Sequence, residues 1–258
     1  MTYKPRIGLT MRVELATRRF YLGRDYSEAV EAAGGLPVHV PLIPRTDFIE
    51  SVVSHLDGVL LPGADCDVDP SFYGEEPHPE LKTVVPEKDQ TDRLVLAAAE
   101  RRNLPVLAIC YGMQALNVFR GGTLIQDIEA QVENSIKHEQ GMPLDRNSHG
   151  AVFTANSILS KIAATENFTN EVKVNSHHHQ AIRKVGHDLE VIARANDGVI
   201  EGIQGNRSDQ FVLGVQWHPE LSWTWDAISA GIFREFVNAC SVYSCDARNE
   251  KMFAELVT

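Results

Sequence analysis

Apolar residues in the first half of the chain recur in two alternating patterns. Short uninterrupted apolar runs, typical of strands buried on both faces, alternate with longer segments whose apolar residues return at helical spacing. The runs lie at 5–10, 36–43, 57–63 and 105–109, and the helical segments at 22–34, 46–56 and 88–103. This order predicts an α/β fold with a mostly parallel sheet flanked by helices.

Beyond residue 130 the pattern changes to short strands separated by turns. We predict strands at AVFT (151–154), VKVN (172–175), LEVIARAN (189–196), VIEGIQ (199–204) and FVLGVQW (211–217). They indicate a smaller antiparallel sheet portion in the C-terminal half. We expect a polar surface loop over 64–86, a closing helix at 224–240 and a further short helix within 245–258. Because no linker or repeat interrupts the sequence, it favours one domain over 1–258.

Composition and charge exclude several classes of protein. The chain has 258 residues, is 43% hydrophobic and carries a formal net charge of −11 without a basic run, which argues against a nucleic-acid partner. It has neither an apolar segment of about 18 residues nor a signal-peptide pattern, so we expect no membrane association. The four cysteines form no C-x-x-C pair, and we expect reduced thiols in a cytoplasmic protein.

Cys110 stands between the apolar run at 105–109 and a helical segment, within the sequence AICYG. This sequence is close to the G-x-nucleophile-x-G turn, which exposes a nucleophile where a strand ends and a helix begins. Amides at such a helix N-terminus face the reacting carbonyl, and the helix end favours the thiolate. The alternative is that Cys110 is a small apolar residue of the core.

A second polar group follows the strand FVLGVQW, which ends at His218-Pro219-Glu220. In an extended chain residues two apart point to the same side, so the Glu220 carboxylate can hold the second ring nitrogen of His218. This is the orienting role of the third member of a catalytic triad, with His218 as the base for Cys110. The alternative is a histidine at a strand end beside a solvated glutamate.

Three consecutive histidines occur in the stretch NSHHHQA (175–181). Three neighbours in one strand cannot all face one metal ion, and no cysteine or acidic residue lies at the spacing of a structural zinc site. We therefore expect no metal site and no cofactor. One or two of these histidines are predicted to line a pocket, and a solvated turn is the alternative.

Together these stretches resemble class I glutamine amidotransferase domains, and within them the γ-glutamyl-γ-aminobutyrate hydrolase (peptidase C26) family. The matching stretches are AGGLPVHVPL (33–42), DGVLLPG (57–63), DVDPSFYGEEP (67–77), LPVLAICYGMQALNVFRGGTLIQDI (104–128), VNSHHHQAI (174–182), DGVIEGI (197–203) and FVLGVQWHPE (211–220). The joint occurrence of the cysteine turn and the later WHPE is highly specific. The resemblance implies a class I glutamine amidotransferase-like fold with a flavodoxin-like core.

The resemblance also implies a catalytic triad of Cys110, His218 and Glu220 acting on γ-glutamyl amides. In that chemistry the thiolate attacks the amide, a γ-glutamyl thioester forms and water hydrolyses it. The implied oxyanion hole uses the Tyr111 backbone amide and one amide of the turn at Gly63 and Ala64. The implied substrate-binding residues are Gln114, Ser176, His178 and His179.

Two departures from the pattern of the family bear on the oxyanion hole. Ala64 stands where the family usually has a second glycine, and alanine fits there only if the turn needs no positive φ. Tyr111 stands where many of these hydrolases have arginine. Because the oxyanion donor at this position is the backbone, we expect catalysis to survive this second change.

The leading prediction is a free-standing hydrolase of γ-glutamyl amines or γ-glutamyl amino acids, such as γ-glutamyl-γ-aminobutyrate, because the chain has no room for a synthetase domain. One alternative is a glutaminase subunit that delivers ammonia to a separate synthase partner. Another is a catalytically inactive binding protein of the same fold. We expect a small-molecule substrate, and the sequence leaves open whether the chain forms a homo-oligomer.

Overall fold

One sheet of nine strands runs through the chain in the order β4-β1-β5-β6-β13-β12-β11-β8-β9. The computed structural model describes the backbone of residues 3–257 and the side chains of residues 3–245. The strands that pair in parallel are β1 (Arg6–Thr10), β4 (Leu36–Val40), β5 (Gly58–Leu61), β6 (Val106–Ile109) and β13 (Val212–Val215). The antiparallel part adds β8 (His149–Phe153), β9 (Glu171–Val174), β11 (Leu189–Ala195) and β12 (Ile200–Gly205). The predicted parallel sheet with a smaller antiparallel portion is confirmed.

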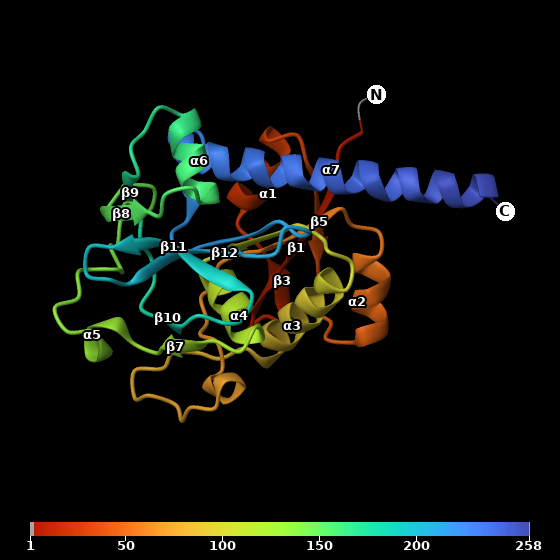
Figure 1. Ribbon diagram of the computed structural model, residues 1–258. Helices are drawn as coiled ribbons and strands as arrows, with labels where there is room; N and C mark the ends of the chain where they lie inside the picture. Colours follow the sequence, from red (N-terminus) through yellow and green to blue (C-terminus); the bar gives the residue numbers. More distant parts are fainter. Residues whose placement is uncertain (1–2, 258) are drawn as a thin grey trace.

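Helices cover both faces of this sheet (Figure 1). One face carries α1 (Arg24–Ala32), α6 (Ile158–Thr165) and α7 (Ala227–Val257), and the other carries α2 (Thr46–Val53), α3 (Pro86–Glu100) and α4 (Tyr111–Phe119). Each face of the sheet has its own hydrophobic core. Within β6, Leu107 and Ile109 belong to the core under α1, α6 and α7, whereas Val106 and Ala108 belong to the core under α2, α3 and α4. Successive side chains of a strand point to opposite faces, which is why the apolar runs are uninterrupted.

Several short elements have no counterpart among the predicted ones. They are the paired strands β2 (Arg12–Glu14) and β3 (Arg19–Tyr21), the paired strands β7 (Thr123–Ile125) and β10 (Ala181–Lys184), the helix α5 (Ile128–Gln131), and the 3₁₀ turns η1 (Pro70–Tyr73) and η2 (Pro219–Leu221). Elements of three or four residues are too short for hydrophobic periodicity to reveal them.

The C-terminal helix differs from its prediction. Helix α7 is continuous from Ala227 to Val257, so the expected separate helix within 245–258 is wrong. No glycine or proline follows Gly231 in the sequence, and nothing there interrupts a helix. Within residues 3–257, no helix is both long and apolar enough to cross a membrane.

The predicted functional residues follow the carboxyl ends of neighbouring parallel strands. Gly63 comes after β5, Cys110 directly after β6 and His218 after β13. In open α/β sheets, ligands bind outside the carboxyl ends of the strands. The topology therefore brings residues from three separate parts of the sequence to one edge of the sheet.

Candidate active site

Cys110 occupies the sharp turn between β6 and α4, where its backbone has φ 52° and ψ −111°. Such a conformation costs a residue other than glycine about 1–3 kcal/mol, so its surroundings must hold it. The Cys110 amide donates to the Val215 carbonyl of β13 (2.8 Å), and its carbonyl accepts from the Gln114 amide (3.1 Å). Gly112 lets α4 pack against β5, because a Cβ there would lie 2.1 Å from the Leu61 carbonyl oxygen.

His218 and Glu220 form a buried pair in which Nδ1 of the imidazole lies 2.6 Å from Oε1 of the carboxylate. The sequence predicts an extended chain through Pro219, but Pro219–Leu221 forms the 3₁₀ turn η2. Proline at the first position of a helical turn has a φ that is already helical. The two side chains therefore meet across a turn, and the alternative of a solvated glutamate is wrong.

The charge state of His218 depends on Cys110 and Glu220. Burial alone would lower the pKa of His218, but the negative charges of Glu220 and Cys110, and the hydrogen bond to Glu220, raise that pKa to about 10. The imidazole is then protonated at neutral pH when the thiol beside it is ionised. A thiolate next to an imidazolium is the reactive form of a catalytic cysteine.

Asn175 holds the backbone of His218 from both sides. Its Oδ1 accepts from the His218 amide and its Nδ2 donates to the His218 carbonyl, each at 2.8 Å. Asn175 directly follows β9, so the stretch NSHHHQA supplies a support for His218 as well as its own histidines. The sequence did not single out Asn175, because a buried asparagine has no periodic pattern.

Tyr26 and Arg12 hold the turn that follows β5. The Gly63 amide donates to the Tyr26 hydroxyl (3.1 Å), and Nε of Arg12 donates to the Gly63 carbonyl (2.6 Å). Burial and then the charge of Glu220 raise the pKa of Tyr26 well above its usual value, which keeps the hydroxyl neutral. Sequence reasoning missed both residues, since Tyr26 occupies an apolar position of α1 and Arg12 lies in a very short strand.

The predicted oxyanion donors differ in availability. The Gly63 amide is occupied by Tyr26, whereas the amides of Ala64 and Tyr111 make no hydrogen bond to any residue in the described part of the chain. Tyr111 is the first residue of α4, where amides have no partner within the helix. Ala64 has no positive φ, so alanine fits this turn. The amides of Ala64 and Tyr111 are therefore free to donate, whereas the Gly63 amide is occupied.

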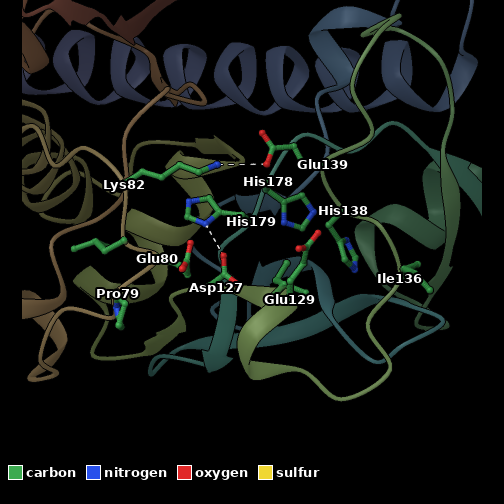
Figure 2. Close-up of a pocket in the computed structure, with 12 residues that line it drawn as sticks. Pro79, Glu80, Lys82, Asp127, Glu129, Ile136, His138, Glu139, His178 and His179 are labelled. Carbon is green, nitrogen blue, oxygen red and sulfur yellow. Dashed lines mark hydrogen bonds and ion pairs between the residues drawn. The ribbon is translucent and has the colours of Figure 1, made fainter.

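A cavity of about 280 Å³ opens beside Cys110 and is lined also by Ala64 and Tyr111. Its lining also includes Lys82 and Glu139, which form an ion pair of 3.4 Å. A second cavity of about 310 Å³ shares Lys82, Glu139 and two of the histidines with the first (Figure 2). The loop after β5 and the segment before β8 therefore build the space in front of the cysteine.

His179 lies between two carboxylates at the cavity wall. Its Nε2 lies 2.8 Å from Oδ1 of Asp67, and its Nδ1 lies 3.3 Å from Oδ2 of Asp127, the contact drawn in Figure 2. Burial lowers the pKa of His179, but the two carboxylates, Asp67 first, raise it above its usual value. The ring lines both cavities, in agreement with its predicted place in a pocket.

Gln114 lines the cavity beside Cys110. Its Nε2 donates to the Gln180 carbonyl and to Oε1 of Gln216, both at 3.1 Å. Because a carbonyl can only accept, these contacts fix which end of the amide is nitrogen. Oε1 of Gln114 accepts no hydrogen bond from the described residues and is available to a donor in the cavity.

Ser176 and His178, which the resemblance assigns to substrate binding, are both buried. Ser176 is fully buried, and its hydroxyl donates to the His138 carbonyl (2.6 Å), so it does not line the cavity. The His178 ring touches the cavity wall but is buried, with Nε2 3.5 Å from Oε1 of Glu201. His178 therefore connects the cavity wall to the interior, whereas Ser176 lies wholly within the interior.

His177, which the sequence did not separate from its two neighbours, lies against the catalytic histidine candidate. Its ring packs edge-on to the His218 ring with the centroids 5.8 Å apart, and it lines the cavity. Nothing in a run of three identical residues indicates which one contacts His218.

The fold places a cysteine at the turn after β6 and a His-Glu pair after β13, the neighbouring strand of the sheet. This arrangement defines a class I glutamine amidotransferase-like domain. The glutaminase domain of Trypanosoma brucei CTPS with bound acivicin superposes with a TM-score of 0.61 at 17% identity, covering 92% of this chain and 94% of that chain. Residues 6–220 match the family model of Peptidase C26, and the chain belongs to this family.

Two relatives are similar over most of their length. The γ-glutamyl-γ-aminobutyrate hydrolase PuuD of Escherichia coli is 34% identical, with 85% of this chain and 86% of the relative covered. The protein NtpR of Enterococcus hirae is 33% identical, with 84% of this chain and 88% of the relative covered. The resemblance seen in the sequence is thereby confirmed, and the family supports a hydrolase or amidotransferase function on amide bonds.

Proposed function

We propose that the chain hydrolyses γ-glutamyl amide bonds of small molecules through a thioester on Cys110. Cys110, His218 and Glu220 are the catalytic residues, hereafter the catalytic group. The proposal rests mainly on the position of Cys110, which has a strained backbone and lies beside His218. The raised pKa of His218 favours an ion pair between its imidazolium and the Cys110 thiolate. The similarity to a γ-glutamyl-γ-aminobutyrate hydrolase supports the substrate class.

In the first half of the reaction, the Cys110 thiolate attacks the γ-carbonyl carbon and a C–S bond forms. The carbonyl oxygen takes the negative charge and accepts hydrogen bonds from the Tyr111 and Ala64 amides. The His218 imidazolium gives its proton to the departing nitrogen, the C–N bond breaks and the amine leaves. Glu220 holds the ring in place and stabilises its positive charge.

In the second half, water attacks the thioester carbonyl and His218 accepts the proton of that water. The C–S bond breaks, Cys110 leaves as the thiolate, and glutamate is released. His218 and Cys110 then form their ion pair again, ready for the next substrate.

The cavity offers groups that suit the glutamyl part of such a substrate. Oε1 of Gln114 is an acceptor without a partner, which suits an α-ammonium group. Lys82 is a cation on the wall and suits a carboxylate, and His179 lines the same cavity. We assign Gln114 and His179 to substrate binding and give Ser176 and His178 no direct contact with it.

The test is turnover of three substrates by the purified protein: glutamine, γ-glutamyl-γ-aminobutyrate and γ-glutamyl-putrescine. We expect hydrolysis of at least one of the two larger amides at a higher kcat/KM than that of glutamine. Turnover of glutamine alone would contradict the proposal in favour of a glutaminase subunit. No turnover of any of the three would favour an inactive binding protein.

A further inference from the structure

Four buried side chains outside the catalytic group point their polar atoms at one another. His138, His149, His178 and Glu201, hereafter the histidine cluster, are each 9% exposed or less. The facing atoms, one from each residue, all lie within 4.8 Å of one another. None of these facing atoms makes a hydrogen bond with any described residue. Buried polar atoms without partners are costly, so the cluster calls for an occupant.

Each ring has an inner nitrogen, which faces the cluster, and an outer nitrogen, which points away from it. The hydrogen bond of the outer nitrogen determines whether the inner nitrogen of a neutral ring is a donor or an acceptor. Nε2 of His138 donates to Asp197 (2.9 Å). Nδ1 of His178 donates to the Gln180 carbonyl (2.9 Å), and Nδ1 of His149 to the Gly150 carbonyl (3.1 Å). A neutral imidazole that donates with one nitrogen presents a lone pair on the other.

With three neutral imidazoles, three lone pairs and a carboxylate converge with no donor between them. A proton on His138, which lies between Asp197 and Glu201, would give Glu201 one donor but leave the inner nitrogens of His149 and His178 without one. Protons alone suit this arrangement poorly, because the His138 ring lies 4.8 Å from both the His149 and His178 rings, and neighbouring imidazolium charges repel. Figure 2 shows His138 and His178 side by side at the wall of the cavity. A divalent cation would satisfy all four groups at once.

The separations match the size of a tetrahedral zinc site. Oε1 of Glu201 lies 3.3, 3.6 and 3.5 Å from the inner nitrogens of His138, His149 and His178. Bonds of about 2.0–2.1 Å to zinc give a tetrahedron with edges of about 3.4 Å. Small rotations of the rings would bring the three inner nitrogens to the same separation from one another. The outer contacts of the rings are the carboxylate and carbonyl partners that metal-binding histidines use.

We propose that His138, His149, His178 and Glu201 bind one divalent transition-metal ion, with Zn²⁺ as the best fit, in a closed structural site. All four positions of a tetrahedron are filled by protein, which leaves none for a reacting water. The residues come from the segment before β8, the start of β8, the segment after β9, and β12, so the ion would join four parts of the chain.

The site would also steady the cavity beside Cys110. The Gln180 carbonyl that accepts from His178 accepts from Gln114 as well. The Glu201 carbonyl accepts from the Gln216 amide, and the Gln216 side chain binds Gln114 too. Loss of the metal is therefore expected to loosen the cavity wall without removing a catalytic residue.

The test measures metal directly, so its outcome does not depend on the proposed hydrolysis. The full chain is stripped with a strong chelator, incubated with ZnCl₂ alone, passed through a desalting column and analysed for metal by mass spectrometry. We expect about one Zn²⁺ per chain, and a rise in Tm of about 5 °C or more at a hundredfold excess over Kd. Less than about a tenth of an ion per chain, with an unchanged Tm, would overturn the proposal.

Two variants and one spectrum assign the ion to the cluster. Glu201→Gln should abolish retention, and Asp197→Asn should weaken zinc binding by about ten- to hundredfold through His138. His187→Gln removes an exposed histidine outside the cluster and should retain zinc fully. If Glu201→Gln does not fold, the Co²⁺-loaded unchanged protein must show the visible absorption of tetrahedral cobalt. Absence of these bands, or zinc retention by folded Glu201→Gln, would contradict the site.

Discussion

The catalytic group and the histidine cluster are both buried polar groups near one cavity, yet their charges are matched in different ways. In the catalytic group, the negative charges of Glu220 and Cys110 raise the pKa of His218 to about 10, so the group supplies its own cation. In the histidine cluster, three ring nitrogens and a carboxylate face one another without a hydrogen bond. The first arrangement holds a proton that it can move, whereas the second needs a cation from outside. The difference separates a reactive site from a structural one.

The largest expected effect is the loss of the nucleophile. Cys110→Ala should lower kcat for the preferred γ-glutamyl amide by at least about 10⁴-fold, because no other group in the catalytic group can form the thioester. The zinc content should not change. Cys245→Ser, an exposed cysteine outside both sites, serves as the control with unchanged kcat. Activity in Cys110→Ala above this level would contradict covalent catalysis.

Replacing the carboxylate should have the next largest effect. Glu220→Gln keeps the size of the side chain but leaves His218 without the charge that orients it, and kcat should fall by about 10³–10⁴-fold. The result is read from steady-state kinetics of the folded variant. A loss smaller than about tenfold would mean that Glu220 is a structural neighbour only.

The same variant should change the pH dependence of stability. The pKa of His218 in the folded protein is raised to about 10, so its contribution to stability is fully present below the unfolded value of about 6.5 and is lost as pH rises toward 10. The stability advantage over Glu220→Gln should therefore shrink between about pH 7 and 10. Denaturant midpoints measured across this range check it, and an advantage independent of pH would contradict it.

Thiol reactivity should separate Cys110 from the other three cysteines. Burial raises the pKa of Cys66 to about 12 and the pKa of Cys240 well above its usual value, whereas Cys110 has the positive charge of His218 beside it. Iodoacetamide near pH 7 should label Cys110 at least about tenfold faster than Cys66, Cys240 or Cys245. Peptide mapping over time measures this, and equal rates would argue against an activated thiolate.

The smallest expected effect concerns the support of the base. Asn175→Ala removes both hydrogen bonds to the His218 backbone and should lower kcat about tenfold with little change in KM, because the ring loses its position rather than its charge. Asn175→Asp keeps the acceptor for the His218 amide and should recover part of the loss. A change confined to KM would assign Asn175 to substrate binding instead.

The catalytic group could be proposed from the sequence because its parts are local. Cys110 lies in a turn whose small neighbours are adjacent in sequence, and His218 and Glu220 are two residues apart after one apolar strand. The strands could be predicted for the same reason, since burial on both faces leaves a continuous apolar run. Choosing Ala64 over Gly63 as oxyanion donor required the position of Tyr26, which comes from a distant helix.

The histidine cluster could not be predicted in this way. The expectation of no metal site rested on the three consecutive histidines, of which only His178 belongs to the cluster. Its other members, His138, His149 and Glu201, follow no ligand spacing along the sequence. Only the antiparallel pairing of β8, β11 and β12 and the fold of the segment before β8 bring them together.

The central claim is a covalent γ-glutamyl intermediate on Cys110, and mass spectrometry of acid-quenched protein tests it most directly. The unchanged protein mixed with a γ-glutamyl amide should gain the mass of one γ-glutamyl group, located on the peptide that contains Cys110. The adduct should be absent from Cys110→Ala and should accumulate when Glu220→Gln slows its hydrolysis. Turnover of the same substrate with no adduct on Cys110 in either protein would contradict the account.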